Sequence, residues 1–312
     1  MKVFIHYIRD YFKEDFQWAP HLIIGAFLAV SIGLNYQYDI YDQILNDHHK
    51  EASSIVYLYL FYLVAFVFSV SIVSIFSKKK EDRPIFNKKY LLFSLIGILF
   101  LSLDCSYYLM QFSVDFLEDV NPYIARWVYM CLSNLHSLLT IIIPLFLIYF
   151  AVKHFKPELY GLRLNGAKVK PYFWLILLMI PLIYLASFQP DFLEAYPSYE
   201  DYQEYKHLGV DQWVTAGTFE LCYGFDFLSV ELFFRGFLVI ALSRFVGRDA
   251  ILPMVTLYCF LHFGKPAGET ISSIFGGYIL GILAYRSRNI YGGLIAHLGV
   301  AWGMELMAYL QG

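Results

Sequence analysis

The sequence predicts an all-α, polytopic membrane protein with about eight to nine transmembrane elements. Hydrophobic residues make up 59% of the 312 residues and charged residues only 16%, whereas soluble domains are about 45–50% apolar and about 25% charged. Aromatic residues contribute 20%, which is more apolar surface than one water-soluble core of this length needs. The composition excludes disorder, collagen-like fibres and disulfide scaffolds. The net charge of −3 gives no reason to expect a nucleic-acid partner.

Apolar runs that approach the length of a membrane-spanning helix, about 20 residues, recur along the chain. We predict spans near 20–36, 54–77, 90–112, 123–152, 171–188, 214–245, 250–263, 270–286 and 290–310. The seventh and eighth are short for a full crossing. We expect them to be half-helices or re-entrant elements, whose backbone must be covered by protein or a water-filled cavity.

Residues 1–18 are predicted to form an amphipathic helix rather than a signal peptide. Charged residues are spread through the segment, and the first apolar run ends without a small-residue cleavage site. Apolar side chains recur at helical spacing, at Val3, Phe4, Tyr7, Ile8, Tyr11, Phe12 and Phe16. Such a helix either lies on the membrane surface or packs on the bundle as an ordinary helix.

The charges of the loops predict the orientation in the membrane. Loops 77–90 and 153–170 are rich in Lys and Arg, whereas loops 37–53 and 189–213 are acidic. Basic loops stay on the cytoplasmic side. We therefore expect a protein of a bacterial inner membrane whose N-terminus is cytoplasmic, with the C-terminus outside if the number of crossings is odd.

Ionisable residues enter the apolar runs mostly after residue 214. They are Glu220, Asp226, Glu231, Arg235, His262, Glu269, His297 and Glu305. A charged group in hydrocarbon costs about 2.5–3.5 kcal/mol even on lenient scales, so these groups must face the interior and find partners. The set predicts a polar cavity or site in this part of the chain. The alternative is a structural network of salt bridges and hydrogen bonds.

Four of these residues carry chemistry at a suitable spacing. Glu231 and Arg235 are one helical turn apart and are therefore able to pair. An acid and two imidazoles, His262 and His297, on separate helices fit an activated water, with the acid as general base and the imidazoles polarising water or an oxyanion. Two His and one carboxylate also form a known metal-ligand set. We expect no cofactor and, if a metal is present, Glu231, His262 and His297 as its ligands.

Three short motifs follow one another on the predicted spans of the last third. They are Val230–Arg235 (VELFFR), Tyr258–His262 (YCFLH) and His297–Ala301 (HLGVA), with the linker 286–293 before the third. They resemble EExxxR, FxxxH and HxxxN or HxxxD, the motifs of the CPBP family of intramembrane endopeptidases, also called Abi or CAAX-protease-like proteins. The resemblance covers about a third of the chain.

The resemblance implies a helical membrane core that activates water to cut a peptide bond in a membrane-delivered peptide or lipoprotein. It implies that Glu231 and His262 handle the water and that His297 stabilises the oxyanion. Arg235 would orient the carboxylate. Membrane lipid and the membrane-embedded substrate are the expected partners. The implied organisation is an interfacial helix at 1–18, N-terminal transmembrane helices at 19–213 and a CPBP-like core at 214–312.

Two side chains of the family pattern are missing. The first Glu of the Glu-Glu pair is Val230, and the Asn or Asp of the third motif is Ala301. Glu231 points about 100° away from residue 230 on an ideal helix, so it replaces the missing base only if the helix is rotated or distorted. The other candidate carboxylates are Glu220, Asp226 and Glu269. The alternatives are a catalytically dead CPBP-fold scaffold and, with less support, a transporter with intramembrane carboxylate relays.

Overall fold

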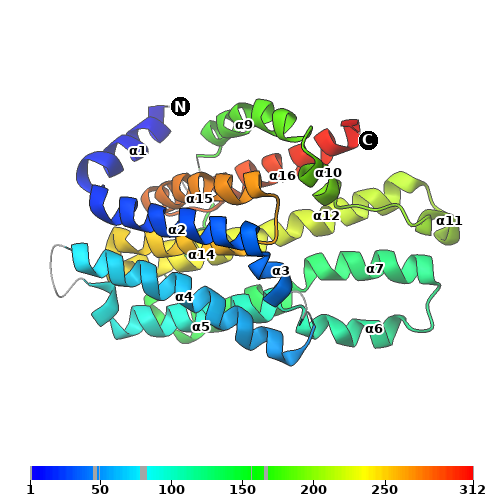
Figure 1. Cartoon of the computed structure of the whole chain (residues 1–312), viewed down its shortest axis with the longest axis horizontal. Helices are drawn as coiled ribbons and strands as arrows, with labels where there is room; N and C mark the ends of the chain where they lie inside the picture. Colours follow the sequence, from blue (N-terminus) through cyan, green and yellow to red (C-terminus); the bar gives the residue numbers. More distant parts are fainter. Residues whose placement is uncertain are drawn as a thin grey trace.

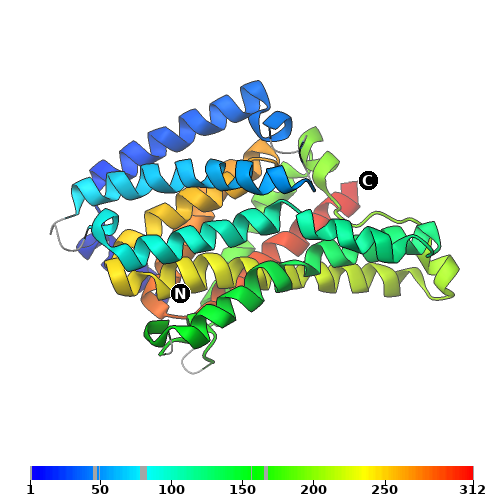
Figure 2. The same cartoon turned by 90° about the horizontal axis from the view of Figure 1, so that it is seen from below.

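The computed structural model describes residues 2–44, 48, 50–77, 83–155, 157–164 and 168–311, and the regular structure in these ranges is helical. Some loop residues used for the orientation lie outside these ranges, namely Asp47, Lys78, Lys79, Lys80 and Lys156. Most of the long helices run roughly along the longest axis of the molecule (Figure 1). The same arrangement is visible from below (Figure 2).

Within the described ranges, five helical stretches are long and apolar enough to cross a membrane. They are α2 (Trp18–Tyr38), α4 (Ala52–Phe76), the continuous stretch Pro122–Ala151, α15 (Ala267–Ser287) and α16 (Tyr291–Gln311). A sixth consists of α5 (Lys88–Cys105) and Tyr108–Leu117, which meet at an angle of 41°. The multispan helical membrane fold is thus confirmed. The count of eight to nine elements stays a prediction.

Two of these spans consist of several elements. Tyr108–Leu117 contains η4 (Tyr108–Met110) and α6 (Gln111–Leu117), and Pro122–Ala151 contains α7 (Pro122–Leu135), η5 (Leu138–Ile142) and α8 (Ile143–Ala151). The remaining elements are α1 (Lys2–Glu14), α3 (Ile40–Ile44), η3 (Pro84–Phe86), η6 (Lys153–Phe155), η7 (Leu159–Gly161), η8 (Lys170–Tyr172), α9 (Phe173–Ala186), α10 (Pro190–Ala195), α11 (Glu204–Leu208), α12 (Gln212–Glu231), η9 (Leu232–Ala241), α13 (Ser243–Val246), η10 (Gly247–Ala250) and α14 (Ile251–Leu261). In both views, α7, α11 and the start of α12 extend beyond α2 and α4 at one end (Figures 1 and 2).

The helices at the seventh and eighth predicted spans differ in length. α14 has 11 residues, as predicted for the short seventh span, and His262 is its C-cap. α15 has 21 residues because it begins directly after its N-cap, Pro266, three residues before the predicted start. The expectation that residues 270–286 are too short to cross is therefore wrong. The two helices form a hairpin. They pack closely at Gly277, because a Cβ at this position would lie only 2.8 Å from Cδ1 of Tyr258.

A π-helix, η9, continues α12 directly after Glu231, and all ten of its residues are buried. π-Helical turns are rare and occur frequently at functional sites. Gly236 allows the close packing of this segment, since a Cβ there would lie 2.7 Å from the backbone oxygen of Tyr160. The helix that carries the first motif is thus distorted. A distortion is what Glu231 needs in order to replace the base that is missing at Val230, although the π-helix begins one residue after Glu231.

The N-terminal segment forms the helix α1, and one face of this helix packs on the bundle. Phe4 and Tyr11 are buried, whereas Ile5 and Phe12 are 59% and 48% exposed. The end of α1 is tied to α15, because Arg286 lies 2.9 Å from the Glu14 carboxylate. Because these apolar side chains are exposed, we continue to predict that α1 lies on the membrane surface.

Glu158 ties the loop before α9 to the ends of two helices. Its carboxylate accepts hydrogen bonds from Arg288 at 2.6 Å and from Arg244 at 3.2 Å. Partial burial raises the pKa of Glu158, but these hydrogen bonds and the two positive charges outweigh that effect, so the pKa lies below its ordinary value.

We therefore expect Glu158 to make unfolding pH-dependent. A carboxyl whose pKa is lowered by folding stabilises the protein above its unfolded pKa, and this contribution is lost as the pH falls through the folded pKa. Thermal unfolding in detergent should show a lower midpoint for Glu158→Gln than for the wild type at pH 7, and a smaller further drop below an ordinary carboxyl pKa of 4.5. Glu194→Gln, at an exposed carboxylate, serves as the control. Equal pH dependence of Glu158→Gln and wild type would contradict this account.

Candidate functional site

Three helices meet at the carboxylate of Glu231. This residue ends α12, and its Oε1 lies 3.1 Å from Nδ1 of His297 on α16. The other ring nitrogen of His297, Nε2, lies 3.2 Å from the hydroxyl of Tyr258 on α14. A carboxylate only accepts hydrogen bonds, so Nδ1 of His297 donates and Nε2 accepts from Tyr258. The structure thus brings residues of all three motifs into one hydrogen-bonded chain.

Arg235 balances the charge of Glu231 inside the protein. The side chains of Glu231 and Arg235 are 0% and 1% exposed, and Nη1 lies 3.0 Å from Oε1. The guanidinium also lies over the ring of Tyr258, 4.3 Å from its centroid. The contact with the carboxylate is an ion pair without hydrogen-bond alignment, since the three guanidinium nitrogens lack a hydrogen-bond partner among the described residues. Removing either partner would leave an uncompensated buried charge.

Gly293 lets the Glu231 carboxylate lie against the backbone of α16. A Cβ at this position would be 2.4 Å from Oε2 of Glu231. This oxygen is buried and accepts no hydrogen bond from the described residues. It is therefore sealed by α16 in this conformation and is not open to a reacting water. The geometry suits a carboxylate that orients His297.

His262 lies at the C-cap of α14 and is linked to this chain through Tyr258. Its Nδ1 lies 2.7 Å from the backbone oxygen of Tyr258, and the two rings lie 4.5 Å apart. A carbonyl only accepts, so Nδ1 carries the proton and Nε2 keeps a free lone pair. Within the described chain, Nε2 has no hydrogen-bond partner. Unlike the other three side chains, this imidazole therefore offers a basic nitrogen to a ligand or water.

The accessory carboxylates lie in three different places. Glu269, in the first turn of α15, accepts a hydrogen bond from the Tyr196 hydroxyl at 2.8 Å and acts electrostatically on His262. Glu220 has a buried Oε2 without a hydrogen-bond partner in the described chain, and its charge interacts with Glu305. Asp226 faces a separate buried group around Asp104. Of the three, Glu269 is the one on a helical turn that packs against the end of α14, since the hydroxyl of the next residue, Thr270, donates to the backbone oxygen of His262.

Two features of the site were missed by sequence reasoning. The family motif has Phe at the position of Tyr258, and the sequence alone does not reveal that the hydroxyl of Tyr258 connects His297 to the α14 helix. A second buried polar cluster joins Asp104 of α5 to His136, at 3.3 Å, and to the hydroxyl of Thr140. An Asp inside the apolar run 90–112 was the available signal for this cluster.

The candidate ligand set for a metal does not converge. Among the described residues, no three His, Cys, Asp or Glu side chains are placed to hold one ion. Glu231 and His297 contact each other directly, whereas His262 is bound to the backbone of Tyr258.

The comparisons with known proteins bear on this same segment. Residues 213–303 match the family model described as "Rce1-like: Type II CAAX prenyl endopeptidase Rce1-like". The match covers less than a third of the chain and includes all three motifs. It confirms the resemblance of this segment to the CPBP family. Neither the curated proteins nor the solved structures contain a match to the chain.

The role of Gly293 predicts a selective effect of an added methyl group. Gly293→Ala would push the buried carboxylate of Glu231 away from α16, and overpacking of this kind typically costs about 1–3 kcal/mol. Gly276→Ala on α15 is the matched control, because a Cβ there meets nothing within 4 Å. Thermal unfolding should show a clear loss for Gly293→Ala and no loss for Gly276→Ala. Equal midpoints for the two variants would contradict the proposed packing.

Proposed function

We propose that this protein is an intramembrane endopeptidase of the CPBP type that cuts a membrane-delivered peptide or lipoprotein. The observation that carries the proposal is the hydrogen-bonded chain from Glu231 through His297 to the Tyr258 hydroxyl, which joins the three motifs. The ring of His262 packs 4.5 Å from the ring of Tyr258. The name of the matching family makes a prenylated peptide with a CAAX C-terminus the first substrate to test.

We also infer that α9, η9 and α14 lie within the bilayer, which would give the eight to nine elements expected from the sequence. η9 is buried along its whole length by the surrounding helices. The basic loops gather at one end of the bundle, since Arg244 and Arg288 meet at Glu158. The positive-inside rule then makes this end cytoplasmic, with the N-terminus on the same side.

In the proposed reaction, His297 and Arg235 act around the buried carboxylate. Glu231 holds His297 through Nδ1. The hydroxyl of Tyr258, which donates to Nε2 of His297 in this structure, would instead donate a hydrogen bond to the oxyanion that forms when water attacks the peptide carbonyl. This arrangement would replace the amide or carboxyl side chain that is absent at Ala301. Arg235 pairs with Glu231 and holds the carboxylate in place.

The general base of this reaction is proposed to be Glu269 together with His262. Val230 has no proton acceptor, and the free oxygen of Glu231 is sealed by Gly293. The hydroxyl of Thr270 donates to the backbone oxygen of His262, which brings the first turn of α15 against the end of α14. Water placed between the two side chains would give a proton to this pair while its oxygen bonds to the carbonyl carbon. The proton then passes to the leaving amine as the C–N bond breaks.

A catalytically dead scaffold of the same fold is the second candidate function. It is favoured by the two missing side chains, at Val230 and Ala301, and by the closed contacts of Glu231. In that case the network would hold the helices together, and the polar region would bind a partner without cutting it.

The two functions are separated by incubating the protein, reconstituted in nanodiscs, with a fluorogenic farnesylated CAAX peptide. The peptidase proposal expects cleavage by the wild type and a fall in kcat of about 10²–10⁴-fold for His262→Ala and for Glu269→Gln, because each removes part of the general base. Glu305→Gln is the control, since Glu305 binds the backbone N–H of Ser198. Its kcat should stay close to that of the wild type.

Each alternative result has a distinct meaning. Loss of cleavage in His262→Ala with full cleavage in Glu269→Gln would reject Glu269 as the base. Absence of cleavage in the wild type, together with a cellular phenotype unchanged by Glu231→Ala or His262→Ala at normal protein levels, would support the scaffold.

A further inference from the structure

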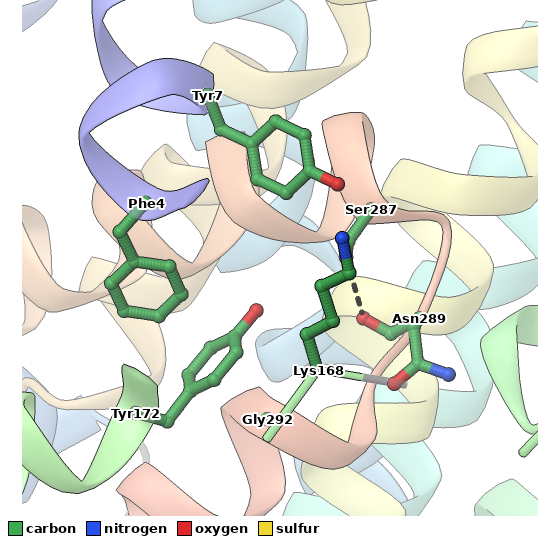
Figure 3. Close-up of a pocket in the computed structure, with 7 residues that line it drawn as sticks. All are labelled: Phe4, Tyr7, Lys168, Tyr172, Ser287, Asn289 and Gly292. Atoms are coloured by element: carbon green, nitrogen blue, oxygen red, sulfur yellow. Dashed lines mark hydrogen bonds between the residues drawn. The ribbon is translucent and has the colours of Figure 1, made fainter. Parts of the chain in front are cut away.

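A small polar cavity lies under the N-terminal helix at the start of α16. Its volume is about 30 Å³. It is lined by Phe4, Tyr7, Lys168, Tyr172, Ser287, Asn289 and Gly292 (Figure 3). A water needs roughly 10–15 Å³ of such space, so the cavity holds about two oxygen-sized atoms. Four separate parts of the chain build it: α1, the segment before η8 together with η8, the end of α15 and its following turn, and the first turn of α16.

Three of the polar groups in this cavity are hydrogen-bond donors. The hydroxyls of Tyr7 and Tyr172 and the ammonium of Lys168 extend into the same space (Figure 3). Tyr172 is only 5% exposed, and its hydroxyl is directed toward Ser287. Among the described residues, neither the Tyr7 hydroxyl nor the Lys168 ammonium has a hydrogen-bond partner. The lining contains no acidic side chain. A cavity with these groups favours an anion with two oxygens.

The backbone at the start of α16 adds to this preference. The side chain of Asn289 accepts from the N–H of Tyr291 and thus begins the helix, and the next residue, Gly292, lines the cavity. The first N–H groups of a helix attract negative charge. Gly292 also allows Tyr172 to pack directly on this turn, because a Cβ there would lie 2.0 Å from a ring carbon of Tyr172.

The surroundings of the cavity indicate where the anion comes from. The ring of Phe4 packs edge-on against Tyr172, 4.4 Å between centroids, and thereby holds α1 over the cavity. Ile5 and Phe12 on the outer face of α1 remain exposed. Amphipathic helices with such a face lie at the boundary between headgroups and acyl chains. The cavity is therefore at headgroup depth, at the end of the bundle that carries the basic loops.

We propose that this cavity binds the phosphate group of an anionic phospholipid, with the two non-bridging oxygens on Tyr7, Tyr172 and Lys168. The cavity has room for the two non-bridging oxygens only, and the ester oxygens and the remainder of the headgroup would lie outside it. The bound phosphate would fasten α1 to the start of α16. Gly293, the residue after Gly292, supports the Glu231 carboxylate, so occupation would also fix the backbone beside the candidate site. The proposal does not depend on peptidase activity.

The test is native mass spectrometry of the protein taken from nanodiscs of phosphatidylcholine with a minor fraction of phosphatidylglycerol. The wild type should retain phosphatidylglycerol preferentially. Lys168→Ala should weaken this retention about tenfold, because it removes the charge-assisted hydrogen bond, and Tyr7→Phe should weaken it by a smaller factor. Lys170→Ala is the matched control, since Lys170 is exposed in the same segment but does not line the cavity. It should retain the lipid as the wild type does.

A second measurement distinguishes a lipid from free phosphate. Addition of phosphatidylglycerol should raise the thermal unfolding midpoint of the wild type and of Lys170→Ala. The rise should be much smaller in the double variant that combines Lys168→Ala and Tyr7→Phe. A comparable rise caused by inorganic phosphate in phosphatidylcholine nanodiscs, again lost in the double variant, would support the anion site and assign it to a soluble phosphate. Equal phosphatidylglycerol retention and equal shifts in the wild type, Lys168→Ala and the double variant would overturn the proposal.

Discussion

The buried ion pair of Glu231 and Arg235 is the interaction on which the C-terminal part of the structure depends. Both side chains are almost completely removed from solvent, and desolvation of two charges is tolerated only when their geometry compensates for it. Here the compensation comes from His297 on α16 and from the ring of Tyr258 on α14. Three helices that are distant in sequence are therefore held in one arrangement by a single carboxylate.

The local backbone follows from the same constraint. α16 carries glycine at position 293 because the carboxylate occupies the volume that a side chain would need. η9, which carries Arg235, is π-helical and buried throughout. The proposed function therefore divides the roles: Glu231 is enclosed and orients His297, whereas His262, whose Nε2 has no hydrogen-bond partner among the described residues, is proposed to react.

The sequence predicts the membrane class, the amphipathic first helix and the pairing of Glu231 with Arg235, because these depend on composition and on spacing within one helix. It does not predict the contact through Tyr258, which depends on the register of α14 against α16. The start of α15 was misplaced because Pro266 begins this helix before its apolar run. The sequence also does not distinguish Glu269 from Asp226, since only tertiary packing brings the first turn of α15 against the backbone of His262.

The most direct test of the central role of Glu231 is a double-mutant cycle on unfolding with Glu231→Gln, His297→Ala and the combination. If the carboxylate orients His297 through a direct buried contact, the free energies of unfolding should be non-additive by about 1–3 kcal/mol, as is typical of residues in one network. Additivity within about 0.5 kcal/mol would contradict the contact and the positioning role assigned to Glu231.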